Sequence, residues 1–506
     1  MADLKLLLVM WMVSFSEQAE VITAQGRIRG ETHQGYVSYN GIPYASVNNT
    51  TGRFKQAGIP PTWSSIRDSQ QSRCSVTSQV DDCLVLDVHV PTSSPPWPVL
   101  VWVKGGGGRY SPGKLVLQDI IVVVVSHRIG PVGFLCLGEE KIPGNAGVKD
   151  VMMALRWVRA NIPAFQGNPY KVVVAGQGFG AAMVEALLLS PISQGLFHGA
   201  IMQSGSVLCP WVFNHDAKDR GVSLLQLLND NDETLTLLNA DVNQLAEKSD
   251  KIYFSYLPFG ICIEKELKNE ERLLSESPYR LASNKFTRRV PLIIGYNTDE
   301  AYIFLSILKG DKMRKKMARD TSILLPDELK FLNENELKTA EKQIKDLYFK
   351  NNFSLATLLA YHRDAYFVGH IHKSARLHAA SDVPVYYYQF SHAGQPGVVA
   401  DHQVRKSGAA HSDELAYLFP ETVGDMEGND ETVQKNLLRL WTDFVKYLEP
   451  TPSGSSPRWE PLDSSQPRVM DIGTELAMKE FPYTRAVSTW DDIYERFYYG
   501  RNYLGA

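Results

Sequence analysis

The chain has 506 residues, of which 44% are hydrophobic and 21% are charged, and its formal net charge is −4. This is the composition of an ordinary globular protein with enough apolar residues to form a large core. Because the chain is slightly acidic overall, neither nucleic acid nor an anionic membrane surface is expected as a partner.

The N-terminus has the features of a secretory signal peptide. Lys5 precedes the apolar run 6–15, and small residues stand at Ser14 and Ser16. The run is too short to cross a bilayer, so we predict a signal peptide over residues 1–16 that is cut after Ser16. A buried N-terminal strand is the alternative. No later apolar stretch reaches membrane length, and we therefore expect a secreted, extracellular protein with no membrane span.

Short apolar runs alternate with amphipathic stretches along the rest of the chain. Runs rich in β-branched and aromatic residues are typical of strands, and apolar residues three and four apart are typical of helices. We expect strands at 98–103, 120–125, 171–175, 199–203, 290–295 and 385–390, and helices at 148–158 and 181–189. This alternation predicts a single α/β domain over residues 17–506, with a large, mostly parallel, twisted central sheet and helices on both faces.

A tight turn lies between the strand at 171–175 and the helix at 181–189. Residues 176–180 have the sequence GQGFG, and the order strand, turn, helix is typical of the G-x-S-x-G nucleophile elbow. Gly178 replaces the serine at the centre of that motif. Glycine has no side chain and cannot form an acyl-enzyme, and loss of the serine in a serine protease lowers turnover on the order of 10⁶-fold.

Further motifs resemble those of the type B carboxylesterases, the cholinesterase-like group of α/β-hydrolases. They are the segments 41–45 (GIPYA), 82–88 (DCLVLDV), 128–135 (RIGPVGFL), 144–147 (GNAG) and 203–206 (QSGS). The resemblance extends over most of the chain. It implies an α/β-hydrolase fold and, for active relatives, hydrolysis of carboxylic esters with no cofactor and no metal.

The resemblance also assigns catalytic positions. Active relatives use a serine, a carboxylate and a histidine in that chain order, with the histidine taking the proton of the serine and the carboxylate orienting the imidazolium. Glu300 matches the carboxylate, His411 matches the histidine, and Gly178 stands at the position of the serine. Two of the three catalytic positions thus keep the residue of the family.

The surroundings of the expected substrate pocket match the family only in part. Gly106 and Gly107 match the glycines of the oxyanion hole, and Phe179 supplies the N–H that follows the nucleophile position. Lys104 stands where the family usually has His or Tyr, and we expect its charge beside the oxyanion hole. The loop 74–83 lacks the aromatic residue that holds a quaternary ammonium in cholinesterases, so a choline ester is not expected as a ligand.

These features predict a secreted, carboxylesterase-like pseudoenzyme that acts by binding. The partner would be an extracellular protein, since non-enzymatic relatives act in adhesion or protein recognition, or a small apolar ligand in the former substrate pocket. The alternative is a residual carboxylic-ester hydrolase, in which His411 and Glu300 activate water or an unrecognised nucleophile acts.

An aromatic stripe lies near the end of the chain. It consists of Trp490, Ile493, Tyr494, Phe497 and Tyr498, which recur at helical spacing. In the family the corresponding helix can pair with its twin across a two-fold axis. A homodimer through this helix and docking of the helix on the chain's own core are therefore the two alternatives.

Five cysteines cannot all pair within one chain. We predict a disulfide between Cys74 and Cys83, which lie in a loop that leads into a strand. Cys136, Cys209 and Cys262 stand in apolar segments and are expected to be buried thiols, with a Cys209–Cys262 disulfide as the alternative.

Three asparagines begin Asn-x-Ser/Thr sequons and are candidates for glycosylation. They are Asn48, Asn49 and Asn352. The first two sequons overlap, so we do not expect both to be modified in the same molecule.

Overall fold

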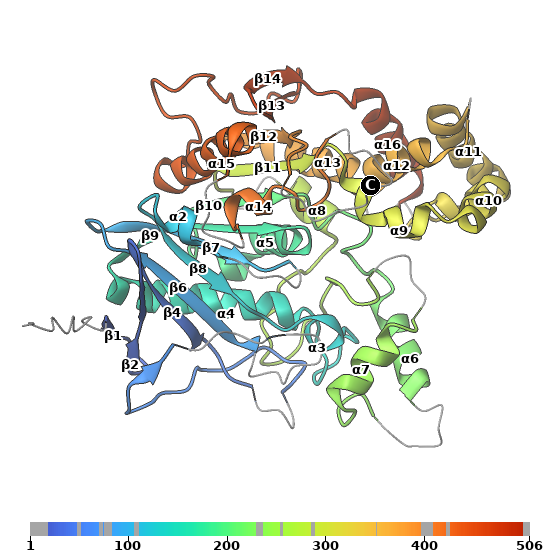
Figure 1. Cartoon of the computed structure of the whole chain (residues 1–506). Coiled ribbons are helices and arrows are strands. Elements are labelled where there is room, and N and C mark those ends of the chain that lie inside the picture. Colours follow the sequence, from blue (N-terminus) through green and yellow to red (C-terminus); the bar gives the residue numbers. More distant parts are fainter. Residues whose placement is uncertain are drawn as a thin grey trace, which may run out of the picture.

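The structure is a computed structural model, and it describes residues 19–47, 52–69, 74, 83–105, 111–228, 236–252, 257–284, 289–350, 352–395, 408–420 and 426–498 (Figure 1). The expected signal peptide, the sequons at Asn48 and Asn49, and the expected oxyanion-hole residues Gly106 and Gly107 lie outside these residues.

The central element is an 11-stranded sheet with the order β14-β13-β12-β11-β10-β9-β7-β8-β6-β4-β3. Its strands are β3 (Glu31–His33), β4 (Tyr36–Pro43), β6 (Val85–Pro91), β7 (Trp97–Val103), β8 (Ile121–Val125), β9 (Gly167–Gln177), β10 (Gly199–Gln203), β11 (Leu292–Asn297), β12 (Val385–Phe390), β13 (Arg468–Ile472) and β14 (Leu476–Glu480). Strands β13 through β8 in this order are parallel, whereas both edges pair antiparallel. A three-stranded sheet of β1 (Glu20–Ile22), β2 (Arg27–Arg29) and β5 (Arg67–Asp68) lies near the N-terminus.

Helices pack on both faces of the large sheet (Figure 1). In the described residues the α-helices are α2 (Gly113–Val116), α3 (Gly130–Phe134), α4 (Ala146–Asn161), α5 (Phe179–Leu189), α6 (Ala217–Leu228), α7 (Val242–Ser249), α8 (Pro278–Ser283), α9 (Leu305–Leu308), α10 (Asp311–Arg319), α11 (Glu334–Ile344), α12 (Leu355–Arg363), α13 (Gly369–Ala379), α14 (Leu415–Leu418), α15 (Gly428–Tyr447) and α16 (Thr484–Phe497). Helices α6, α7, α10 and α11 lie away from the sheet (Figure 1). Shorter 3₁₀ or π segments are η1 (Ile162–Phe165), η2 (Pro191–Ser193), η3 (Glu300–Phe304), η4 (Thr321–Leu324), η5 (Lys345–Phe349) and η6 (Asp364–Val368).

Side chains of β7 alternate between the two layers of the core. Val101 and Val103 belong to the core that contains the apolar faces of α4 and α5, whereas Trp102 belongs to the core that contains α15. The strands at the centre of the sheet are buried on both faces, and the five residues of β8 are all fully buried. The predicted α/β class with a mostly parallel central sheet is confirmed, as is each predicted strand and helix.

Two disulfides connect four of the five cysteines. The predicted Cys74–Cys83 disulfide is present. The expectation of three buried thiols is wrong, because Cys136 and Cys262 form the second disulfide and leave Cys209 as the buried free thiol. The partners are 126 residues apart in sequence, so no local pattern links them. Gly144 makes room for the pair, since a Cβ at this position would lie 2.6 Å and 2.7 Å from the two sulfurs.

The aromatic stripe of α16 packs on the chain's own core. Its side chains are at most 5% exposed, and the Tyr494 hydroxyl donates a hydrogen bond to the buried carboxylate of Glu328. The stripe is therefore covered within one chain, and homodimerisation through it stays a prediction. None of the helices in the described ranges is long and apolar enough to cross a bilayer.

The Cys136–Cys262 disulfide makes the first testable prediction. Replacing both cysteines with serine should lower the free energy of unfolding by about 5 kcal/mol, because the closed loop of 126 residues restricts the unfolded chain. The same replacement of Cys74 and Cys83, which are 9 residues apart, should cost about 2.5 kcal/mol. Urea unfolding followed by tryptophan fluorescence measures both. An equal or larger loss in the Cys74/Cys83 variant would contradict this order.

Candidate active site

The tight turn predicted at 176–180 lies between β9 and α5. Gly178 has φ 59° and ψ −121°, a backbone conformation that costs a residue with a Cβ about 1–3 kcal/mol and that glycine adopts without this penalty. The N–H of Gly178 donates to the carbonyl oxygen of Gln203, at the end of β10, at 2.8 Å. Phe179 is the first residue of α5, where the N–H groups have no acceptor within the helix.

The loops after β7 and β10 pack with their backbones directly against the backbone of this turn. A Cβ on Gly105 would lie 2.0 Å from the carbonyl oxygen of Gln177, and a Cβ on Gly205 would lie 2.0 Å from that of Gly178. No side chain fits at either position. The ends of β7, β9 and β10 therefore meet at the turn, where parallel strands of an α/β sheet place their ligand sites.

Glu300 and His411 come together from two further loops. Glu300 is fully buried at the start of η3, where its Oε1 accepts a hydrogen bond from the N–H of Asn297 at 2.8 Å. Its Oε2 lies 2.5 Å from Nδ1 of His411, which is the hydrogen bond that orients an imidazole in a catalytic triad. The N–H of Asp299 also donates to the carbonyl oxygen of Ala409 at 2.8 Å and joins the two loops.

The imidazole of His411 reaches the turn at Gly178. A Cβ on Gly178 would lie 3.1 Å from Nε2 of His411, which is tighter than an ordinary contact. The three residues predicted to share a site thus do so, with the ring directly over the position that carries no side chain. The pair can orient an imidazole and hold a proton, but residue 178 offers no atom that could attack an ester.

Gln177 is a site residue that the sequence did not reveal. Its side-chain Nε2 lies 3.1 Å from Nε2 of His411, where the amide N–H donates to the neutral ring. If the ring is protonated, the amide can turn and accept through its oxygen. Gln177 therefore occupies the hydrogen-bonding position that a serine hydroxyl would take. The only signal in the sequence was its place beside residue 178.

The pKa of His411 reflects two opposing effects. Burial lowers it, but the charge of Glu300 and the hydrogen bond to this carboxylate raise it, with help from Glu414 and Asp413. The net direction is a rise above the usual value of 6.5. The side chain remains 11% exposed, so the ring still touches solvent.

Glu414 is a second buried carboxyl group behind the pair. Its oxygens accept hydrogen bonds from Gln203 Nε2 at 3.0 Å and Asn297 Nδ2 at 2.5 Å. Burial, together with the nearby charge of Glu300, raises the pKa of Glu414 to about 7. The sequence placed this residue three positions after His411 but gave no reason to assign it a role.

Lys104 does not point into the site as expected. Its ammonium donates to Ser126 Oγ at 3.1 Å, and its charge interacts with the half-buried Asp87. Both partners belong to the β8 and β6 side of β7, which is opposite the side of β9. Burial lowers the pKa of Lys104, and Asp87 partly restores it. The direction of the Lys104 side chain is set by contacts between neighbouring strands, which one sequence cannot show.

An aromatic side chain lies against the imidazole, and a second one packs behind it. Phe367, in η6, lies with its ring centre 5.1 Å from that of His411. Trp211 packs against Phe367 and donates from Nε1 to a backbone oxygen at 2.8 Å.

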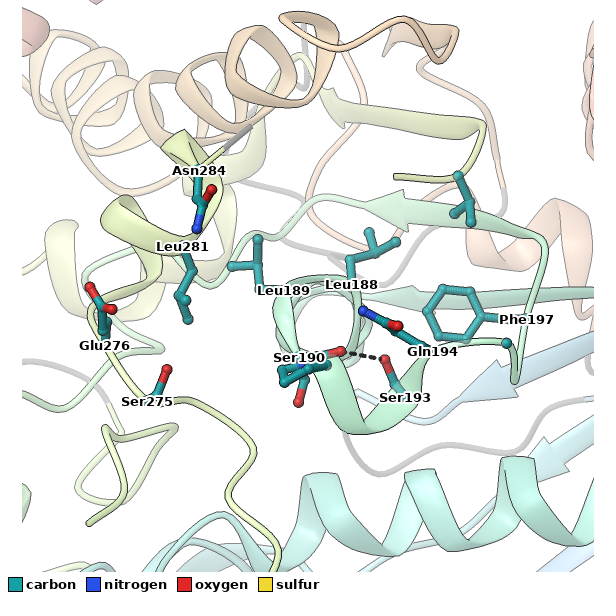
Figure 2. A pocket seen from close by; sticks show the side chains of 13 residues that line it. Leu188, Leu189, Ser190, Ser193, Gln194, Phe197, Ser275, Glu276, Leu281 and Asn284 are labelled. Atoms are coloured by element: carbon teal, nitrogen blue, oxygen red, sulfur yellow. Dashed lines mark hydrogen bonds between the residues drawn. The ribbon is translucent and has the colours of Figure 1, made fainter. Parts of the chain in front are cut away.

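A separate cavity of about 250 Å³ lies at the other end of α5 (Figure 2). Leu188, Leu189 and Phe197 form part of its apolar wall, while Ser193 donates to the carbonyl oxygen of Ser190 at its side. The 11 residues of α5 separate its two ends by about 16 Å. The cavity is therefore distinct from the site at Gly178.

In the part of the chain that the structure describes, no group of three or more His, Cys, Asp or Glu residues is placed to hold a metal ion. Asn352, the sequon inside the described ranges, is exposed just before α12. Its glycosylation stays a prediction.

Comparison with known proteins gives a consistent set of relatives. A family model described as the carboxylesterase family matches residues 17–490. The chain is 29% identical to the pyrethroid hydrolase Ces2e of Rattus norvegicus, over 91% of this chain and 88% of the relative. It is 26% identical to juvenile hormone esterase of Heliothis virescens, over 96% and 95%. A crystal structure of juvenile hormone esterase from Manduca sexta, with OTFP covalently attached, has a TM-score of 0.84 and 25% identity and covers 95% of this chain and 100% of that chain.

The pairing of His411 with Glu300 predicts a specific titration. In the folded protein the pKa of His411 should lie above 6.5, and Glu300→Gln should lower it because the neighbouring negative charge is lost. Since the folded pKa is the higher one, the pair stabilises the protein below pH 6.5 and loses this contribution as the pH rises through the folded pKa.

NMR of histidine ring protons measures this titration. His89, His362 and His370 are internal references, because burial lowers their pKa values to about 3, 4 and 4, and they stay neutral in the same range. A His411 pKa that does not change in the Glu300→Gln protein would refute the assigned cause.

Proposed function

The chain belongs to the carboxylesterase family, and on that premise we propose that it is a member without serine-esterase activity that acts by binding. The observation that carries the proposal is the environment of His411 Nε2. In a serine esterase this atom takes the proton of the serine, whereas here Gly178 supplies no hydroxyl and Gln177 donates to it at 3.1 Å.

The ring position supports the same proposal. A serine at 178 would place its Cβ 3.1 Å from Nε2, so the imidazole, which lies against the bare turn, would have to shift by about a few tenths of an ångström to accommodate it. The hydrogen-bonded series Glu300–His411–Gln177 is complete without a nucleophile. It satisfies buried polar groups and in this way stabilises the junction of the loops.

The binding partner falls into one of two classes. A small apolar ligand is one class, and it is supported by the aromatic ring of Phe367 beside His411 and by Trp211, which packs against Phe367. An extracellular protein is the other class, and it rests on the resemblance to non-enzymatic relatives. Secretion is part of this proposal, and the two disulfides support it, because disulfides persist in oxidising, extracellular environments. Cleavage of a signal peptide after Ser16 and a single domain over 17–506 stay predictions.

Residual hydrolysis through activated water is the alternative function. It is favoured by the intact hydrogen bond of 2.5 Å between His411 and Glu300. The Gln177 amide opposes it, because a neutral Nε2 that already accepts a hydrogen bond is not free to take a proton from water.

The purified protein should not hydrolyse a short-chain aryl ester faster than its His411→Ala variant does. It should also gain no mass on incubation with a fluorophosphonate probe, because no activated serine is present. Turnover that the probe abolishes would overturn the proposal. Turnover that is insensitive to the probe but lost in His411→Ala would instead establish the water-based alternative.

Restoring the serine tests whether the rest of the site is still competent. Gly178→Ser should raise kcat/KM for the aryl ester by a factor of about 10² to 10⁴ over Gly178→Ala, which has the same backbone strain but no hydroxyl. Adding Gln177→Ala should give a further factor of about 2 to 10, because a competing hydrogen bond worth about 0.5–1.5 kcal/mol is removed. If Gly178→Ser and Gly178→Ser/Gln177→Ala both fold but remain inactive, other parts of the site besides residue 178 have lost their catalytic geometry.

A further inference from the structure

Helix α10 has a row of cations on its outer face, hereafter the cationic row. It consists of Lys312, Lys315, Lys316 and Arg319, all exposed. The spacing i, i+3, i+4, i+7 places the four side chains within an arc of about 100° on the helix. Met313 and Met317 lie on another side and are half-buried, and Met317 packs against the core. Figure 1 shows α10 at the outer edge of the molecule, beside α9 and α11.

The cationic row differs from the other charged helices of the chain in its pairing. Several exposed helical lysines elsewhere form an ion pair with a carboxylate four residues away, as in Lys251–Glu247, Lys338–Glu334 and Lys435–Glu431. On α10, Asp311 and Asp320 stand four residues from Lys315 and Lys316, but Asp311 pairs with Arg314, and Asp320 interacts with Lys316 only through longer-range charge attraction. Over the residues that the structure covers, no carboxylate lies within ion-pair distance of the four cations.

Repulsion within the row works against the helix. Each cation has like-charged neighbours three or four residues away, an arrangement that destabilises a helix. The chain as a whole has a net charge of −4, so the row is a local concentration of positive charge on a protein that is negative overall. The expectation that nucleic acid and anionic membrane surfaces are not partners rested on the net charge, which does not register a local row of this kind. A polyanion along the row would remove the repulsion and release its own counterions.

We propose that the cationic row binds a linear sulfated polysaccharide of the glycosaminoglycan type. The row is one side chain wide and about 10 Å long, which suits a linear chain of anionic groups. Residues 309–320 contain no aromatic side chain on which a nucleic acid base could stack. The apolar face of α10 is turned toward the protein, so the helix has no free face to enter a lipid surface. This inference does not depend on the proposed loss of esterase activity.

The test measures the binding of a heparin dodecasaccharide at several salt concentrations. The row variant Lys312→Ala/Lys315→Ala/Lys316→Ala/Arg319→Ala should bind at least 10-fold more weakly at about 0.1 M salt, and its salt dependence should be shallower by about one counterion per cation removed. The matched control Lys251→Ala/Lys338→Ala/Lys342→Ala/Lys435→Ala removes the same charge from lysines that have acidic partners. The heparin affinity of this control should stay within about twofold of that of the natural protein.

Further arms separate the proposal from general charge attraction. Desulfated heparin should not bind, and phosphatidylserine vesicles and single-stranded DNA should bind more weakly than heparin. Ile303 and Ile307, which are exposed just before α10, are the residues that a vesicle surface would contact. The proposal would be overturned if the two quadruple variants lost heparin affinity equally. It would also be overturned if the protein bound vesicles or DNA as tightly as heparin. If the row variant misfolds, Lys312→Arg/Lys315→Arg/Lys316→Arg keeps the charges and must retain heparin binding.

Discussion

The backbone of Gly178 is held by its surroundings, and the site depends on this constraint. Its N–H donates a hydrogen bond to the backbone at the end of β10. Gly105 and Gly205, in the neighbouring loops, lie so close to the turn that neither position has room for a side chain. The positive φ is therefore set by the packing of neighbouring strand ends. Glycine meets this requirement with no strain, and so the turn persists whether or not it serves catalysis.

The same constraint explains why His411 and Glu300 remain ordered. A buried carboxylate and an imidazole need hydrogen-bond partners in any folded protein, with or without a substrate. Gln177, whose position is fixed by the turn, supplies the last of these partners. The three side chains connect the ends of β9 and β11 with the loop before α14. They therefore have a structural role that does not depend on catalysis.

The sequence predicted the sheet well because its central strands are buried on both faces and are filled with β-branched residues, as in β8. It also placed Gly178, Glu300 and His411 at one site, since their order matches a known pattern. It missed what depends on side-chain direction or on distant contacts. Lys104 turns away toward Ser126, and Cys136 pairs with Cys262 across 126 residues.

The pairing of the cysteines has a consequence for how copies of the protein can associate. Four thiols are used within the chain, and the fifth, Cys209, is fully buried in the core. Burial also raises the pKa of this thiol well above its usual value, so it is held as the unreactive protonated form. The folded surface therefore offers no sulfur for a bond between chains. A disulfide between two folded copies would first require the exposure of Cys209 or the opening of an existing disulfide.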